Sequence, residues 1–327
     1  MNKTLCSAFW NHTNIRGGDR VFPCCRFKQP IQTFDGNVAA VLHSAEYDRL
    51  RQDSITGVYN PNCEKCYYEE QNGKESLRER FNKEYTIDQV ELKYLEIGFD
   101  NICNLACDGC WEEWSSTWAN IKSPSTKKIN ILTTKEFINI PDTLNKVLFL
   151  GGEPLMTSRH NRFLKKLNSP EAISVIYYTN GTFLFSDDDL ELLNKFKHVV
   201  VYVSIDGIGE LNDSVRKGSK WSEILTFLEQ LKNTKFEIKI NSVIHRNNWM
   251  GIKELSDFIK QNNYVWTTNL LTYPTKLDII NLMPREKQEF ECMLNEEKIP
   301  NADYILKHLC QEKINLDTEQ LVSESKT

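Results

Sequence analysis

Three cysteines occur within a span of eight residues, Cys103, Cys107 and Cys110 in the stretch CNLACDGC. Thiolates are the ordinary ligands of iron–sulfur clusters, which usually take four of them. Three thiolates can hold three irons of a [4Fe–4S] cluster and leave the fourth iron open to another ligand, much as a catalytic zinc site keeps an open position. The spacing predicts such a site, and a zinc ion bound by three thiolates is the alternative.

Eight of the ten cysteines lie before residue 111. In a cytosolic chain thiols are kept reduced, so this crowding favours metal or cluster ligation over disulfide bonds. Cys292 and Cys310 stand alone in helical windows. We expect both to lie in the core, because a free cysteine packs as a small hydrophobic residue.

A second pattern is KVLFLGGEP, in which an apolar run ends in Gly151, Gly152, Glu153 and Pro154. Glycines allow a ligand to approach the backbone closely. A carboxylate at this position can accept hydrogen bonds from an ammonium group. The stretch is therefore a candidate binding turn.

Short apolar runs alternate with helical windows from about residue 92 onward, which predicts βαβ units and a parallel sheet. The runs are YLEIGF, KVLFLGG, ISVIYYTNG, VVVYVSIDG, IKINSVI and the weaker YVWTTNLL. Six such units fit a partial barrel or a doubly wound sheet. The cysteine loop follows the first run and the Gly-Gly turn follows the second, at the strand ends where barrel enzymes gather their catalytic groups.

Strand parity favours the barrel. Val199, Val201 and Val203 point one way, whereas Tyr202 and Ser204 point the other. A sheet covered by helices on both faces should be apolar on both. One polar face in strand after strand predicts a lumen that holds a polar ligand, unless some parities are misassigned.

The composition is that of a soluble globular protein, with 40% hydrophobic and 26% charged residues among 327. A net charge of −5 gives no indication of a nucleic-acid partner. No window has the apolar length of a membrane span, and the first residues lack the apolar core of a signal peptide. We therefore expect a cytoplasmic protein with no membrane partner.

Together, the CxxxCxxC loop after the first strand and GGEP after the second resemble the radical SAM superfamily, over roughly residues 90–275. The resemblance implies an α/β fold with a partial (β/α)6 barrel at 89–275 and a helical extension with a polar tail at 276–327. It also implies that Cys103, Cys107 and Cys110 bind a [4Fe–4S] cluster whose open iron binds S-adenosyl-L-methionine (SAM). One-electron cleavage of SAM then gives a 5′-deoxyadenosyl radical that abstracts a hydrogen atom from the substrate, while the protein binds and orients.

The resemblance also assigns SAM-binding residues by motif. These are Gly151, Gly152, Glu153 and Pro154 for the methionine amine, Asn180 and Ser204 at strand ends, Arg216 for the carboxylate, and Val243 for the adenine. The family usually carries an aromatic residue just before the third cysteine. Here that residue is Gly109, so the adenine contact must come from elsewhere, and Trp111 is a candidate.

The N-terminal cysteines resemble the auxiliary-cluster domain called twitch, which is related to SPASM, placed here before the barrel at residues 1–88. This implies a second [4Fe–4S] cluster bound by Cys6, Cys24, Cys63 and Cys66. Cys25 is then the spare cysteine, although Cys24 and Cys25 could exchange roles. A four-cysteine zinc knuckle is the alternative.

The resemblance implies a radical SAM enzyme whose substrate enters the barrel mouth. Glu96, Tyr202 and Asp206 are the candidate catalytic residues, with Asp206 as a proton acceptor or a loop cap. Tyr178, Lys239 and Asn241 are further polar candidates near the substrate. We expect peptide modification by cross-linking, oxidation or epimerisation, with flavodoxin or ferredoxin as electron donor. The alternatives are a dehydrogenase or epimerase of a sugar or aminocyclitol, and a non-catalytic iron–sulfur or zinc protein.

Overall fold

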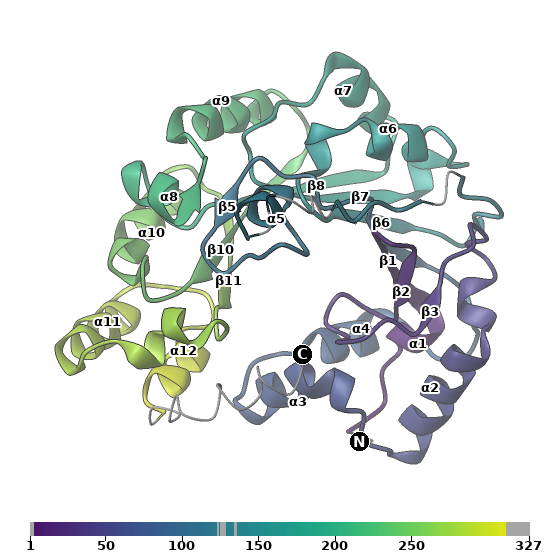
Figure 1. Cartoon of the computed structure of the whole chain (residues 1–327), viewed down its shortest axis with the longest axis horizontal. Helices are drawn as coiled ribbons and strands as arrows, with labels where there is room; N and C mark the ends of the chain where they lie inside the picture. Colours follow the sequence, from purple (N-terminus) through teal and green to yellow (C-terminus); the bar gives the residue numbers. More distant parts are fainter. Residues whose placement is uncertain (1–2, 123, 125–128, 134–135, 312–327) are drawn as a thin grey trace.

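The fold is built on one curved sheet, seen in a computed structural model that describes residues 3–122, 124, 129–133 and 136–311. Within these residues the sheet has nine strands in the order β11-β10-β8-β7-β6-β4-β1-β2-β3. Figure 1 shows the strands around an open centre, with helices on the outside.

Six of these strands correspond to the six apolar runs of the sequence, and each pairs with its neighbours in parallel. They are β4 (Tyr94–Gly98), β6 (Lys146–Leu150), β7 (Ser174–Thr179), β8 (His198–Ser204), β10 (Glu237–Ile244) and β11 (Val265–Leu270). The predicted α/β fold with a mostly parallel sheet is thus confirmed, and the arrangement is consistent with the predicted partial barrel.

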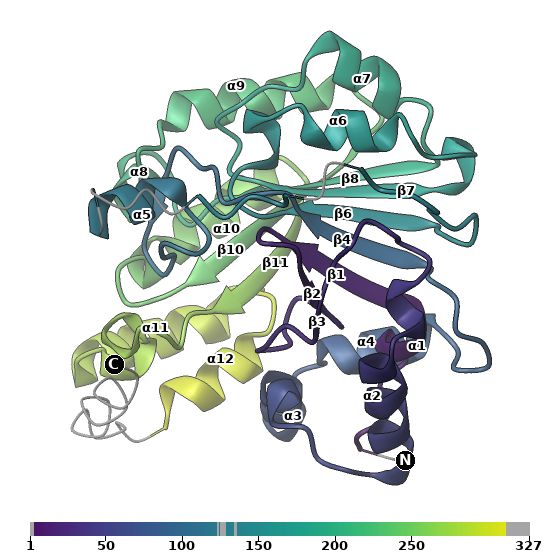
Figure 2. The ribbon, with the colours of Figure 1, turned by 45° about the vertical axis from the view of Figure 1, so that its right-hand side comes forward.

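Helices cover the outer face of the sheet. They include α6 (Arg159–Leu164), α7 (Asp187–Leu193), α8 (Glu210–Val215), α9 (Trp221–Lys232) and α10 (Ile252–Gln261). The short helix α5 (Ser116–Lys122) lies instead beside β5 (Ala106–Cys107) (Figure 1). Helix α9 turns Ile224, Phe227, Leu228 and Leu231 towards the sheet, at the spacing of one helix face. Figure 2 shows α6, α7 and α9 on one side of the strands.

The two faces of the strands differ as their parity predicts. On β8, Val199, Val201 and Val203 are buried in the core beneath the helices. Tyr202 and Ser204 point to the other side and are only half-buried. The polar residues therefore line the inner face of the curved sheet.

The N-terminal segment adds strands to this same sheet. Strand β1 (His12–Arg16) pairs in parallel with β4, and β2 (Arg20–Phe22) and β3 (Gln32–Thr33) follow in antiparallel pairing. The boundary predicted at residue 88 is therefore no break in the sheet. Strand β1 was not predicted from its residue pattern, because His12, Thr13 and Asn14 are polar residues that are fully buried.

The remaining helices are α1 (Ala8–Asn11), α2 (Ala45–Thr56), α3 (Glu64–Gln71), α4 (Leu77–Glu84), α11 (Pro284–Glu296) and α12 (Ala302–Leu309). Cys292 and Cys310 are exposed, so the prediction that they are core residues is wrong. Their helices bury other side chains, such as Phe290 on α11 and Leu309 on α12. The predicted polar tail at 312–327 lies outside the described residues. Among the described residues, no helix is long and apolar enough to cross a membrane.

Candidate active site

One large cavity, of about 990 Å³, opens at the inner face of the sheet. Predicted site residues that line it are Cys103, Cys107, Cys110, Trp111, Gly151, Gly152, Asn180, Ser204, Asp206, Arg216, Val243, Glu96 and Tyr202. Tyr178 and Asn241 line it as well, whereas Lys239, Glu153 and Pro154 do not. The fold thus brings most of the candidate residues to one place.

Helix α5 holds the cysteine loop by its backbone. The hydroxyl of Thr117 donates to the carbonyl of Cys103 at 2.7 Å, and the indole N–H of Trp118 donates to the carbonyl of Cys107 at 3.0 Å. The short strand β5 (Ala106–Cys107) pairs with β9 (Arg216–Lys217). These contacts leave all three thiols facing the cavity.

The surroundings of the three thiols disfavour their thiolate forms unless a positively charged group binds them. Burial raises the pKa of Cys103 to about 11 and that of Cys110 to about 12, and the neighbouring cysteines add to both shifts. Burial also raises the pKa of Cys107, whereas the charge of Arg216 opposes that rise. Thiols that repel one another as thiolates are the donors that a metal cluster stabilises. Among the described residues, no three Cys, His, Asp or Glu side chains are grouped to hold a single metal ion.

The backbone and the packing around residue 109, just before the third cysteine, explain why it is a glycine and not the expected aromatic residue. Its φ of +78° is in the left-handed region, and a Cβ atom would lie 2.7 Å from both methyl carbons of Leu271. A side chain at this position would therefore be strained and would clash. Leu271 lines the cavity here and is an apolar contact that the sequence did not point to.

Gly151 and Gly152 are required because the protein's own backbone packs directly against them. A Cβ on Gly151 would lie 2.6 Å from the carbonyl oxygen of Asp100, and one on Gly152 would lie 2.1 Å from that of Ile102. The backbone leading into the cysteine loop therefore packs directly on this turn. The close approach predicted for a ligand is made, at least in part, by the protein backbone.

Glu153 has a different position from the one predicted. Its side chain is 2% exposed and accepts hydrogen bonds from the Thr179 hydroxyl and the Asn180 amide, both at 2.7 Å, and from the Leu155 amide at 3.1 Å. Burial raises its pKa, and the bonds from Asn180 and Thr179 oppose that rise. The carboxylate thus joins the ends of β6 and β7 and caps the turn η3 (Pro154–Met156).

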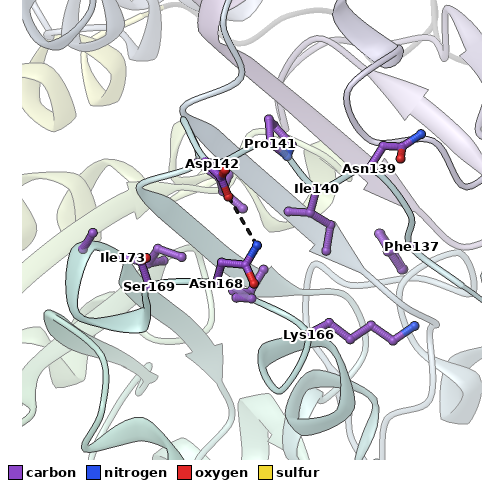
Figure 3. Close-up of a pocket in the computed structure, with 12 residues that line it drawn as sticks. Phe137, Asn139, Ile140, Pro141, Asp142, Lys166, Asn168, Ser169 and Ile173 are labelled. Atoms are coloured by element: carbon purple, nitrogen blue, oxygen red, sulfur yellow. Dashed lines mark hydrogen bonds between the residues drawn. The ribbon is translucent and has the colours of Figure 1, made fainter.

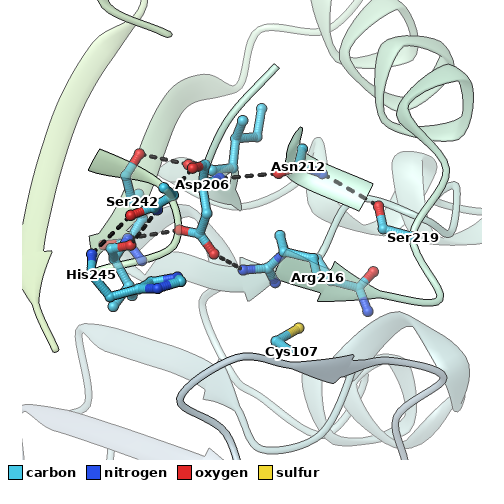
Figure 4. Close-up of polar contacts among 12 residues, drawn as sticks. Cys107, Asp206, Asn212, Arg216, Ser219, Ser242 and His245 are labelled. Carbon is cyan, nitrogen blue, oxygen red and sulfur yellow. Dashed lines mark hydrogen bonds and ion pairs between the residues drawn. The ribbon is translucent and has the colours of Figure 1, made fainter. Parts of the chain in front are cut away.

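Arg216 and Asp206 form a buried ion pair beside Cys107, shown in Figure 4. Nη1 of Arg216 donates to Oδ2 of Asp206 at 2.7 Å, and the amide of Val243 donates to Oδ1 at 2.7 Å. Burial opposes the charge of Arg216, but Cys107 and Asp206 together raise its pKa. With both carboxylate oxygens engaged, Asp206 holds Arg216 in place.

One donor of Arg216 is left over. Its Nε atom is buried and has no hydrogen-bond partner among the described residues. A buried unpaired donor is costly, so such a group in a cavity wall usually has a ligand. A carboxylate in the cavity would satisfy it.

The inner face of the sheet supplies the polar lumen. The rings of Tyr178 and Tyr202 stack with centroids 4.4 Å apart and planes 2° apart. Glu96 is 2% exposed and lies beside His12 and Asn14 of β1. Burial raises the pKa of Glu96, but His12, Asn14 and Arg16 outweigh it and lower the pKa overall. Glu96 was a predicted site residue, whereas His12, Asn14 and Arg16 were not.

The N-terminal cysteines divide between two places. Cys6, Cys24, Cys63 and Cys66 line a small pocket of their own with Phe9, Phe27 and Phe81. Cys25 instead lines the large cavity. Cys6, Cys24, Cys63 and Cys66 thus line one pocket and Cys25 lines another, while their role as cluster ligands stays a prediction.

A separate cavity of about 310 Å³ lies between the loop before β6 and the end of α6 (Figure 3). Its wall includes Phe137, Asp142, Lys166 and Asn168, with a hydrogen bond from Asn168 to Asp142 at 3.3 Å. No predicted site residue lies in this wall. The predicted residues that line a pocket are thus found in the large cavity and in the small cysteine pocket.

Residues 97–259 match the family model described as the radical SAM superfamily. The chain is 28% identical over 211 residues to the GTP 3′,8-cyclase of Clostridium perfringens (strain SM101 / Type A), covering 63% of this chain and 61% of that relative. Solved structures that resemble it include native anSMEcpe with bound AdoMet (20% identity, 62% of this chain, 60% of that one, TM-score 0.46). Another is Streptococcus suis SuiB bound to S-adenosylmethionine (16% identity, 77% and 50%, TM-score 0.42). The chain spans about three fifths of the length of the cyclase.

Proposed function

Because residues 97–259 match the family model of the radical SAM superfamily, we propose that this protein is a radical SAM enzyme that abstracts a hydrogen atom from a substrate held in the large cavity. One observation carries the proposal: three thiols of one loop, the Gly151–Gly152 turn and Arg216 all face the same cavity of about 990 Å³. The family implies a [4Fe–4S] cluster and SAM, which together supply a 5′-deoxyadenosyl radical when bound.

The residues present fit these groups. Cys103, Cys107 and Cys110 would hold the cluster, and the positive charge of Arg216 beside Cys107 would offset its thiolates. The unpaired Nε of Arg216 is a donor for the methionine carboxylate of SAM. Asn180, which donates to Asn104 at 2.9 Å, and Ser204 add polar groups to the same wall.

Glu153 has a supporting role in this proposal. Its carboxylate is occupied by three donors of the protein, so it fixes the turn and β7 instead of meeting the methionine amine. For the adenine, Leu271, Val243 and Trp111 are the apolar groups of the cavity wall near the loop. They take the place of the aromatic residue that Gly109 excludes.

The proposal includes an auxiliary [4Fe–4S] cluster bound by Cys6, Cys24, Cys63 and Cys66. Burial raises the pKa of Cys24 well above its ordinary value, and the charges of the other cysteines add to the shift. Burial also raises the pKa of Cys6 and Cys63, and the charge of Arg78 opposes that rise. Four cysteines that line one apolar pocket with a nearby cation are a suitable ligand set for an anionic cluster.

We favour a peptide or peptide-like substrate because one wall of the cavity is neutral and rich in amides. Asn269 donates to Asn241 at 3.0 Å, and Asn301 and Thr267 lie beside them. Such groups match the hydrogen bonds of a peptide backbone. A small-molecule substrate is the second candidate, favoured by the similarity to a GTP 3′,8-cyclase.

The experiment is reconstitution with iron and sulfide, followed by reduction and addition of SAM. Dithionite replaces the natural donor, for which we propose flavodoxin or ferredoxin. We expect release of 5′-deoxyadenosine and about eight irons per chain. Replacing Cys103, Cys107 and Cys110 together by alanine should abolish release and leave about four irons, whereas the same change at exposed Cys292 and Cys310 should alter neither.

Two outcomes would contradict the proposal. Full iron content with no 5′-deoxyadenosine would indicate a non-catalytic iron–sulfur protein. A single tightly bound zinc in place of iron would indicate a structural metal site. Candidate peptides and nucleotides added to the active enzyme, with product mass as the measurement, then separate the two substrate classes.

A further inference from the structure

Cys24 and Cys25 are consecutive residues that face different sites. Cys24 lines the small pocket with Cys6, Cys63 and Cys66, and Cys25 lines the large cavity with Cys103, Cys107 and Cys110. The Cys25 side chain is accessible from the cavity. Protein nevertheless surrounds it so closely that burial raises the pKa of its thiol to about 12. Cys25 is thus an additional thiol inside the proposed reaction chamber.

Two buried side chains of β1 hold the backbone on either side of this pair. Nδ1 of His12 forms a hydrogen bond with the carbonyl of Pro23 at 2.7 Å, and Nη2 of Arg16 donates to the carbonyl of Cys25 at 2.8 Å. The Arg16 guanidinium lies over the rings of Phe22 and Trp114, at 4.1 and 4.6 Å from their centroids. The backbone of the Cys24–Cys25 pair is therefore held on both sides.

Glu96 connects these supports to the thiol. Its carboxylate contacts His12 and accepts a hydrogen bond from Asn14, whose own Oδ1 accepts one from Arg16. The charge of Glu96 also adds to the rise in the pKa of Cys25. Glu96 and Cys25 both line the large cavity.

We propose that Cys25 is a hydrogen-atom donor to a carbon radical formed in this cavity, an inference that rests on the proposed function. The substrate radical takes the hydrogen atom of the Cys25 S–H bond, so a C–H bond forms, the S–H bond breaks and a thiyl radical remains on Cys25. An S–H bond is weaker than most C–H bonds, which makes the transfer favourable. The net change in the substrate is then redox-neutral, as in inversion of a carbon centre.

The thiyl radical needs one electron and one proton to restore the thiol. A one-electron donor of the iron–sulfur class supplies the electron, and the proposed auxiliary cluster, with Cys24 as a ligand, is next to Cys25 in the chain. The external reductant replenishes that cluster. The proton comes from solvent, so the product carries one solvent-derived hydrogen.

The first test separates donor from ligand and requires no turnover. Cys25→Ser in the reconstituted protein should keep the iron content and the electron paramagnetic resonance spectrum of the wild type, whereas Cys24→Ser should lose about four irons. Loss of about four irons in Cys25→Ser would overturn the inference.

The second test measures the transfer. In D2O with dithionite and SAM but no substrate, the radical derived from SAM replaces the substrate radical, and the exchanged Cys25 thiol carries deuterium. We expect wild type and Cys292→Ser to release 5′-deoxyadenosine with one deuterium, and Cys25→Ser to release several-fold less of the deuterated form, because an O–H bond is a poor hydrogen-atom donor. Equal deuterium content in all three would refute the role of Cys25. No 5′-deoxyadenosine from any of them would refute the proposed function itself.

Discussion

Arg216 carries a buried charge whose only carboxylate partner in the described part of the chain is Asp206. Replacing Arg216 by alanine leaves that carboxylate buried and uncompensated, and we expect the free energy of unfolding to fall by about 3–5 kcal/mol. Urea unfolding of the protein without cofactors measures the change. Arg216→Lys should recover part of the loss, because the ammonium keeps the charge but lacks the guanidinium fork.

Lys217 provides the matched control for that variant. It follows Arg216 on β9 and pairs with Asp108 at 2.8 Å, but its side chain is 58% exposed. Lys217→Ala should cost about 1 kcal/mol or less. If Arg216→Ala costs no more than Lys217→Ala, the ion pair has no special weight in the stability of the site.

Gly109 gives a prediction about the cysteine loop. Gly109→Ala should destabilise the protein by about 1–2 kcal/mol, because alanine disfavours a φ of +78° and its Cβ would clash with Leu271. The double variant Gly109→Ala/Leu271→Ala removes the clash but keeps the backbone strain. Gly109→Ala should therefore cost less stability in the Leu271→Ala background than in the wild type, but the cost should not vanish. Thermal unfolding with iron content measures both effects, and full additivity of the two changes would contradict the contact.

At the scale of elements, Glu297 joins α10 to the end of α11. It pairs with Lys253 and Lys260, which lower its pKa to about 2 from an ordinary value of 4.5. A lowered pKa contributes stability that is present above the ordinary value and is lost as the pH falls towards 2. Glu297→Gln should therefore reduce stability at neutral pH by about 1 kcal/mol and flatten the acid side of the profile.

Chemical unfolding between about pH 2 and pH 7 tests this expectation against Glu296→Gln, since Glu296 is an exposed residue of the same helix. The Glu296 variant should follow the wild-type profile. Parallel profiles for Glu297→Gln and wild type would show that the helix junction does not depend on this ion pair.

The strands of the sheet were predictable where their side chains alternate cleanly. Val199, Val201 and Val203 on one face of β8 against Tyr202 and Ser204 on the other indicated both the strand and the polar lumen. Strand β1 gave no such signal, because buried His12, Thr13 and Asn14 are held by hydrogen bonds and ring contacts with residues far along the sequence. Partners of that kind exist only after folding.

The site was predictable in its residue types more than in their roles. Cysteine spacing identified the loop, and the GGEP stretch identified the turn. The sequence could not show that Gly151 and Gly152 accommodate the backbone of Asp100 and Ile102, or that Glu153 points into β7. It also could not decide between Cys24 and Cys25, since the choice depends on how β1 and β2 direct the residues after Pro23.

At the scale of the whole molecule, contacts between α3 and α12 join the two ends of the described chain. The Tyr68 hydroxyl lies 3.1 Å from Nδ1 of His308, and Nε2 of His308 lies 2.8 Å from Asp278. Lys307 adds a contact to the carbonyl of Asn72 at 3.3 Å. The N-terminal and C-terminal segments therefore meet across the open side of the curved sheet.

Tyr68→Phe removes the hydroxyl that bridges these segments and leaves its His308 partner without that bond. We expect a loss of about 1–2 kcal/mol in unfolding free energy and faster hydrogen exchange in α3 and α12 than in the strands. Tyr59→Phe, which changes a tyrosine that is 58% exposed, should have no such effect. Equal exchange in the two variants would argue against a closing role for this contact.

One peptide unit separates Cys24 from Cys25, and consecutive Cα atoms are about 3.8 Å apart whatever the rest of the chain does. Domain motion therefore cannot separate Cys25 from the proposed auxiliary centre, of which Cys24 is a proposed ligand. Any tuning of electron flow must then act on the reduction potential of the auxiliary centre, through cations such as Arg26 and Arg78 that surround it. Substitutions that remove the charge of Arg26 or Arg78 should therefore change the rate of electron transfer, whereas changes in linker length should not.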